Sequence, residues 1–179
     1  MKIQGTVRVL LVAAIMVLPL VGASPGIAAD MGSMPGMTGG TDLTQTAGPY
    51  RIVLEVLPPE PFYTKAQVKQ NHVTDGMVVF GGATPVQPDD ASHPNHHLIV
   101  HIYKSATGKV LRGGHVTMTY ALASSSGAAA TAVPVVEMRV IGKGPESTHY
   151  GNNVALAPGT YHVIVTAMGK PATFTVNVS

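Results

Sequence analysis

The chain has 179 residues, of which 45% are hydrophobic and only 11% charged, with a formal net charge of +2, no Cys and no Trp. This low charge excludes the disordered and coiled-coil classes, which carry far more charged residues. The lack of Cys excludes disulfides, thiolate metal sites and a cysteine nucleophile, so any transition metal must be held by His, Met, carboxylate or backbone groups.

The first 29 residues have the pattern of a secretory signal peptide. Lys2 and Arg8 precede an uncharged, mostly apolar run over 9–22, and small residues close the segment at 26–29. This pattern predicts cleavage near residue 29 and a periplasmic or secreted protein. Removing Lys2 and Arg8 takes Lys plus Arg from 11 to 9, against 9 Asp plus Glu, so the remaining chain has a formal charge of 9 − 9 = 0. Nucleic-acid binding, which needs a basic surface, is therefore not indicated.

Residues 30–49 are rich in Gly, Thr, Pro and Met and contain almost no core-forming side chains. We expect a flexible tail here. Its three thioethers, Met31, Met34 and Met37, are spaced by three residues, and soft sulfur ligands favour Cu(I). The tail is thus either a Cu(I)-binding segment or an inert linker.

From residue 50 onward the sequence consists of short runs with a period of two, which is typical of half-buried strands. Turn residues separate these runs every 8–12 residues, so we predict an all-β fold over 50–179, an antiparallel β-sandwich of the immunoglobulin-like or cupredoxin-like kind. A short helical turn is expected over 64–72. The expected strands cover 51–57, 77–80, 96–103, 109–112, 116–122, 133–141, 154–156, 161–168 and 172–178.

Alternation along these strands also predicts the core, because residues two apart share a face. The expected core residues are those on the inward side of four strands: Ile52, Leu54, Leu98, Val100, Ile102, Val163, Val165, Phe174 and Val176.

Two histidines share the other face of the strand over 96–103. His97 and His101 are four residues apart, which places them about 13 Å apart along a strand, too far to bind one ion without other ligands. Each would need partners from neighbouring strands or loops. The alternative is that they are ordinary surface histidines.

A second group of candidate ligands follows later in the chain. Glu137 and Met138 lie on an expected strand, where Met138 has the parity of its apolar neighbours and is equally explained as a core residue. His149 is followed by Tyr, Gly and two Asn, residue types common in turns. We expect a loop here that holds the His149 ring at one end of the sandwich.

The segment from His97 to Tyr161 resembles the periplasmic metal-binding proteins encoded beside bacterial iron-uptake permeases. The residues that carry this resemblance are His97-Leu98, Glu137-Met138, His149-Tyr150-Gly151-Asn152-Asn153-Val154 and Pro158-Gly159-Thr160-Tyr161. The His-Tyr-Gly tripeptide is its most specific part.

The resemblance implies an immunoglobulin-like sandwich that tends to form homodimers and binds copper, alone or together with iron, in partnership with a membrane metal permease. It implies His97, Met138 and His149 as ligands. The His-x-Glu pattern of the family reads His97-Leu98-Ile99 here, so another group, from His101, Met118 or Glu137, would complete the set.

The sequence contains no nucleophile elbow, no His-Glu-x-x-His motif and no Gly-rich phosphate loop, so we expect this protein not to be an enzyme. Two functions remain open. The first is a secreted metal-binding protein that supports metal uptake or homeostasis. The second is a metal-free β-sandwich that acts in adhesion or as a structural interaction module. Convergence of the three expected ligands would favour the first, and their dispersal the second.

Overall fold

The computed structural model describes residues 43–125, 127 and 129–179. The expected signal peptide over 1–29 and the methionines at 31, 34 and 37 lie outside these residues. Within the described ranges, no helix is both long and apolar enough to span a bilayer.

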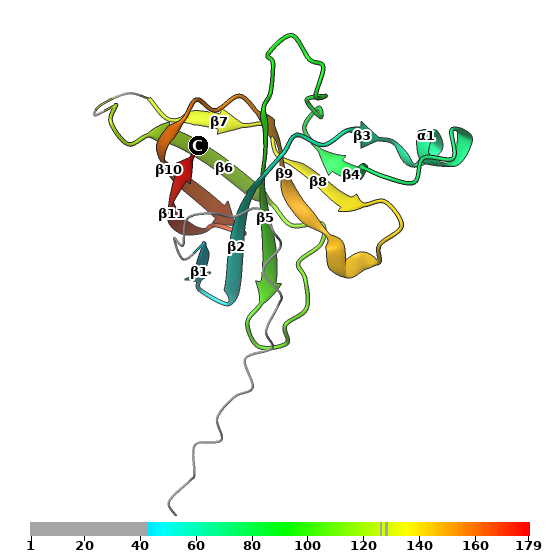
Figure 1. Ribbon diagram of the computed structural model, residues 1–179. Helices are drawn as coiled ribbons and strands as arrows, with labels where there is room; N and C mark the ends of the chain where they lie inside the picture. Colours follow the sequence, from blue (N-terminus) through cyan, green and yellow to red (C-terminus); the bar gives the residue numbers. More distant parts are fainter. Residues whose placement is uncertain (1–42, 126, 128) are drawn as a thin grey trace, which may run out of the picture. The chain divides into compact units, whose positions relative to one another are not determined.

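The described chain forms two sheets and almost no helix, which confirms the all-β sandwich (Figure 1). The finer immunoglobulin-like or cupredoxin-like description stays a prediction. The larger sheet has seven strands in the spatial order β1 (Thr44–Ala47), β2 (Tyr50–Leu57), β5 (His96–Lys104), β9 (His149–Val154), β8 (Val136–Val140), β4 (Met77–Gly82) and β3 (Phe62–Tyr63). The smaller sheet has the order β11 (Lys170–Val178), β10 (Gly159–Ala167), β6 (Val116–Leu122) and β7 (Thr131–Val133).

The main hydrophobic core lies between the two sheets. All nine expected core residues belong to it, so the parity argument for the strands is confirmed. On β5, for example, Leu98, Val100 and Ile102 are at most 1% exposed and point into this core. The face of the seven-stranded sheet that carries His97 and His101 is therefore the opposite one.

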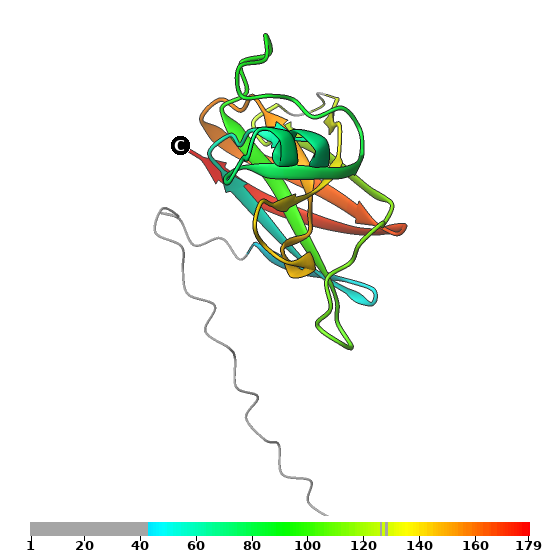
Figure 2. The same ribbon diagram turned by 90° about the vertical axis from the view of Figure 1, so that its right-hand side faces the viewer.

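The seven-stranded sheet extends beyond the four-stranded sheet on the side of β8, β4 and β3 (Figure 1). There it carries a second, smaller apolar cluster, separate from the main core: Phe62, Met77, Ile99, Val136 and Met138. The helix α1 (Lys65–Gln70) lies at this end of the molecule and is nearest the viewer in Figure 2.

The helical turn expected over 64–72 is confirmed as α1. Thr64 begins it with a capping box, in which the Thr64 hydroxyl accepts a hydrogen bond from the Gln67 backbone and the Gln67 side chain accepts one from the Thr64 backbone. These reciprocal bonds satisfy two backbone donors that a short helix would otherwise leave free.

The expected boundary between tail and domain at residue 50 is wrong. Thr44–Ala47 already forms β1, an edge strand paired with β2, and the Leu54 backbone donates to the Leu43 carbonyl at 2.8 Å. Gly48, with a φ of +59°, makes the turn between the two strands. The composition of 30–49 concealed this hairpin, because only its last few residues have strand character.

The single strand expected over 133–141 is also wrong. It is divided by Pro134, which cannot donate to a ladder, into β7 of the small sheet and β8 of the large one. The strand expected over 109–112 is reduced to one bridge between Tyr103 and Val110.

The segment starting at His149 is a strand rather than the loop that the sequence suggests. All six residues of β9 are buried, and the strand pairs with β5 on one side and β8 on the other. Its two asparagines do not form turns. Asn152 donates to the backbone oxygens of Thr84 and Pro134, so this side chain ties the sheet to neighbouring loops.

Candidate metal centre

The histidines at 97, 101 and 149 gather on the outer face of the seven-stranded sheet. Met138 pairs with His149 across β8 and β9, and the His101 ring lies beside that of His149, with 5.1 Å between ring centres. The His97 ring meets that of His149 edge to face at 6.0 Å. His149 thus stands between the two histidines of β5, and the group lies on a sheet face rather than at the expected end of the sandwich.

His97 is fully buried, and its orientation is fixed by Asn153. The ring Nδ1 lies 2.8 Å from Asn153 Oδ1, which also accepts a hydrogen bond from the Glu60 backbone. Asn153 Nδ2 donates to the carbonyls of Glu60 and Val86, so its oxygen is the acceptor toward His97. The His97 Nδ1 therefore carries the proton, and its Nε2 presents a lone pair. That Nε2 is buried and has no hydrogen-bond partner.

His149 has the same arrangement with a different partner. Its Nδ1 lies 2.8 Å from the Ser147 carbonyl, which can only accept, so Nδ1 is protonated and donates. Its Nε2 is buried without a partner. A ring whose Nδ1–H is held by an oxygen while Nε2 is left free is the usual arrangement of a metal-binding histidine.

Burial keeps both rings neutral. Desolvation lowers the pKa of His97 to about 4, with the Asn153 hydrogen bond opposing it. Desolvation, followed by repulsion from His101, lowers the pKa of His149 to about 3. Neutral imidazole is the form that binds a metal, so at neutral pH neither ring needs to lose a proton first.

His101 stands at the solvent-facing side of the group. Its side chain is 18% exposed, and its Nε2 lies 3.7 Å from a Glu55 carboxylate oxygen. Burial lowers the pKa of His101, while Glu55 and the Thr148 backbone oppose this effect. Its ring also stacks on that of Tyr103, with 6.3 Å between centres. This histidine is therefore the member of the group through which solvent would reach the other two.

The second apolar cluster borders these rings and includes two methionines. Phe62 packs against the His97 ring at 5.6 Å, and Met138 is fully buried in the second cluster. Met77 belongs to the same cluster. No pattern in the sequence singles out Met77, which has the parity of an ordinary strand residue.

Two residues expected as additional ligands lie elsewhere. Glu137 has the opposite parity to Met138 on β8, and its carboxylate accepts a hydrogen bond from the Gly113 backbone at 2.9 Å. Met118 is on β6, in the main core between the sheets. Neither belongs to the group around His149, because strand parity and sheet membership separate them from it.

The ring spacing is compatible with a shared ion. An imidazole nitrogen binds a metal at about 2.0–2.1 Å, which places the centres of two rings on one ion roughly 5–6 Å apart. Among residues 43–125, 127 and 129–179, no group of three or more His, Asp or Glu side chains is suited to hold a metal. The soft donor beside the rings is the thioether of Met138, the strand partner of His149.

Comparisons with known proteins found no matching family model, no matching curated protein and no matching solved structure.

Proposed function

We propose that this protein is a non-catalytic copper-binding protein whose ligands are Nε2 of His97, Nε2 of His149 and the thioether of Met138. The observation that carries the proposal is that three buried histidine nitrogens have no hydrogen-bond partner, and two of them, Nε2 of His97 and Nε2 of His149, belong to rings 6.0 Å apart; the third is Nδ1 of His101. An unsatisfied buried polar atom costs about 1–3 kcal/mol, and a bound metal would remove this cost at both rings.

Copper is favoured by the types of donor. Thioether sulfur selects soft ions, whereas imidazole suits copper in both oxidation states. Zinc sites usually have four N, O or S ligands in a closed tetrahedron, and the described residues offer no group of three or more His, Asp or Glu for one. His101 is the candidate for a further ligand, because its ring lies 5.1 Å from that of His149.

The biological setting is proposed from the sequence. The basic and apolar segment over 1–29 supports export to the periplasm or beyond. The resemblance to metal-binding proteins of iron-uptake systems supports a role in metal uptake or homeostasis, with a membrane permease as recipient, iron as a second metal, and a homodimeric immunoglobulin-like sandwich.

The test compares Met138, which lies in the proposed site, with Met118, which lies in the main core. The protein is titrated with Cu(I) in competition with a chromogenic chelator, and separately with Cu(II), Fe(II) and Zn(II). We expect Cu(I) to bind at one equivalent in the described domain, and Met138→Leu to weaken it by at least about tenfold. Met118→Leu is the control, because Met118 is equally buried but lies in the main core.

The second candidate is a metal-free interaction module, and the absence of a group of three His, Asp or Glu ligands in the described part of the chain favours it. In that case none of the four metal ions binds the described domain, or Met138→Leu and Met118→Leu change copper affinity equally. Either result would contradict the proposed copper site.

A further inference from the structure

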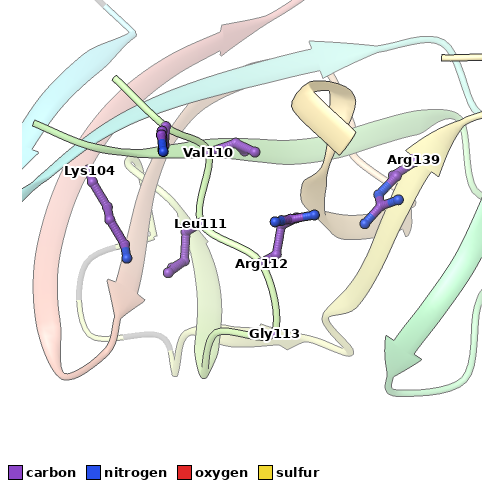
Figure 3. A pocket seen from close by; sticks show the side chains of 7 residues that line it. Lys104, Val110, Leu111, Arg112, Gly113 and Arg139 are labelled. Carbon is purple, nitrogen blue, oxygen red and sulfur yellow. The ribbon is translucent and has the colours of Figure 1, made fainter. Parts of the chain in front are cut away.

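A second candidate site lies on the opposite side of β8, at a pocket of about 450 Å³. The segment over 104–113 forms most of its wall, and Arg139 of β8 lies at one side of it (Figure 3). The lining residues are Lys104, Lys109, Val110, Leu111, Arg112, Gly113 and Arg139. A volume of this size is typical of small-molecule sites, which span about 300–1,000 Å³.

The pocket is unusually basic for this chain. Four of its seven lining residues are cationic, although the sequence after residue 29 has only 9 Lys and Arg and a formal charge of zero. Within the described ranges, the ion pair with a separation of 4.0 Å or less is that of His101 with Glu55. The four cations of the pocket therefore have no carboxylate of the described residues within 4.0 Å. The carboxylate of Glu137 accepts from the Gly113 backbone at the pocket wall, which leaves an excess of three positive charges.

Arg139 is held in place before any ligand arrives. Its Nε donates to Thr148 Oγ1 at 2.8 Å, and its guanidinium carbon lies 4.0 Å above the Phe80 ring. Arg112 lies across the hollow from Arg139, and Figure 3 shows both guanidinium groups in the space between their backbones. Two such forks on either side of a hollow match the geometry of carboxylate or phosphate oxygens, which Arg binds in a bidentate manner.

We propose that this pocket binds a compact multivalent oxyanion, with Arg112 and Arg139 as the forked ligands and Lys104 and Lys109 as neighbouring point charges. A small polycarboxylate suits the volume better than a lone phosphate, which would leave much of it empty. This site is distinct from the proposed copper site, because Arg139 and Met138 are adjacent on β8 and point to opposite faces of the sheet.

Calorimetric titration of the full chain tests the proposal, after metals have been removed on a chelating resin, since polycarboxylates bind metals themselves. Citrate and inorganic phosphate are the two probes, each at about 150 mM NaCl to screen non-specific attraction. We expect citrate to bind with one-to-one stoichiometry and more tightly than phosphate. Tighter binding of phosphate would still place an oxyanion in the pocket but would overturn the assignment of a polycarboxylate.

Charge-removing variants locate the site. Arg112→Gln is expected to weaken citrate binding by at least about tenfold, and Arg112→Lys to restore only part of it, because lysine keeps the charge but not the fork. Lys69→Gln is the matched control, since Lys69 is an exposed cation on α1 and does not line the pocket. Thermal unfolding of each variant shows whether the fold is intact.

Three outcomes would overturn the proposal. The first is the absence of binding by either anion at millimolar concentration. The second is an equal loss in Arg112→Gln and Lys69→Gln, which would indicate a general charge effect. The third is binding to phosphatidylglycerol vesicles with no binding of the small anions, which would identify a membrane surface as the ligand.

Discussion

At the scale of single residues, the unusual feature is a pair of neutral, buried imidazoles in which only one of the two ring nitrogens has a hydrogen-bond partner. His97 and His149 each use Nδ1 in a hydrogen bond and leave Nε2 without a partner. Natural proteins satisfy nearly all buried polar groups, so each exception calls for a physical reason. A bound metal would be such a reason, since it would use both free lone pairs.

The depressed pKa values of these rings predict how the stability of the metal-free protein depends on pH. In the unfolded chain both histidines bind a proton below about pH 6.5, whereas the folded rings resist it until about 4 for His97 and about 3 for His149. The free energy of unfolding should therefore fall as the pH is lowered from 6.5 and level off below those values. Each pKa unit corresponds to about 1.4 kcal/mol, so each ring contributes on the order of a few kcal/mol.

Urea unfolding at pH 7, 5.5 and 4.5 measures this dependence. The His149→Gln variant provides the comparison, because it removes one of the two titrating rings. We expect its stability to change less between pH 7 and 4.5 than that of the wild type. Identical pH dependence in the two proteins would contradict the pKa assignment of His149.

Asn153 is the residue on which the orientation of His97 depends most. Its side chain accepts from His97 and from the Glu60 backbone, and donates to two loop carbonyls. Asn153→Ala should leave several buried groups unsatisfied and lower the free energy of unfolding by about 2–4 kcal/mol. The exposed Asn177 accepts one bond from Thr160, and Asn177→Ala should cost less than about 0.5 kcal/mol. Equal costs in urea unfolding would show that the Asn153 network contributes little.

At the scale of elements, β9 determines the geometry of the site, because it lies between β5 and β8 and carries His149 and Asn153. Close passage of β5 past this strand requires a glycine at position 151. A Cβ on Gly151 would collide with the Leu98 carbonyl oxygen and lie 2.8 Å from the Ile99 Cα. This tight contact holds the His149 and His97 rings on neighbouring strands at a fixed spacing.

We therefore expect Gly151→Ala to be strongly destabilising, by about 2–4 kcal/mol, or to fail to fold. Gly81→Ala on β4 is the control, because a Cβ there meets no atom within 4 Å. The free energy of unfolding in urea distinguishes the two variants. A Gly151→Ala protein as stable as Gly81→Ala would contradict the close packing of β9 against β5.

Strand parity was predictable from the sequence, but strand neighbours were not. Alternation alone put Leu98 in the core and His97 on the other face, and both positions are confirmed. The spacing along one strand could not show that His149 would stand between His97 and His101, because that depends on register between distant segments. Asn152 and Asn153 misled the interpretation, since their amides bond to loops across the sheet rather than forming turns.

At the scale of the whole molecule, the two faces of the seven-stranded sheet differ in their surroundings. Its inner face packs against the four-stranded sheet, while its outer face holds the histidines and the second apolar cluster. The sequence predicted the sandwich because its pattern has period two throughout. It could not predict that the large sheet extends past the small one, since Met77 and Phe62 read as ordinary apolar residues.

Copper should stabilise the whole domain if it binds only the folded state. At a free Cu(I) concentration about 100 times the dissociation constant, the gain is about 2.7 kcal/mol, equivalent to a rise in Tm of roughly 5–10 °C for a chain of this size. Differential scanning calorimetry under anaerobic conditions measures it. Met118→Leu should keep the rise and Met138→Leu should lose most of it, and a rise of equal size in both variants would place copper elsewhere.

The most direct test of the copper site is nitrogen NMR of the histidine side chains, with and without Cu(I), which is diamagnetic. Before addition, His97 and His149 should both appear as neutral rings with the proton on Nδ1 and an unprotonated Nε2 at pH 7. One equivalent of Cu(I) should shift Nε2 of these two rings and leave the exposed His162 unchanged. Protonated Nε2 atoms in the free protein, or shifts confined to exposed histidines, would contradict the site.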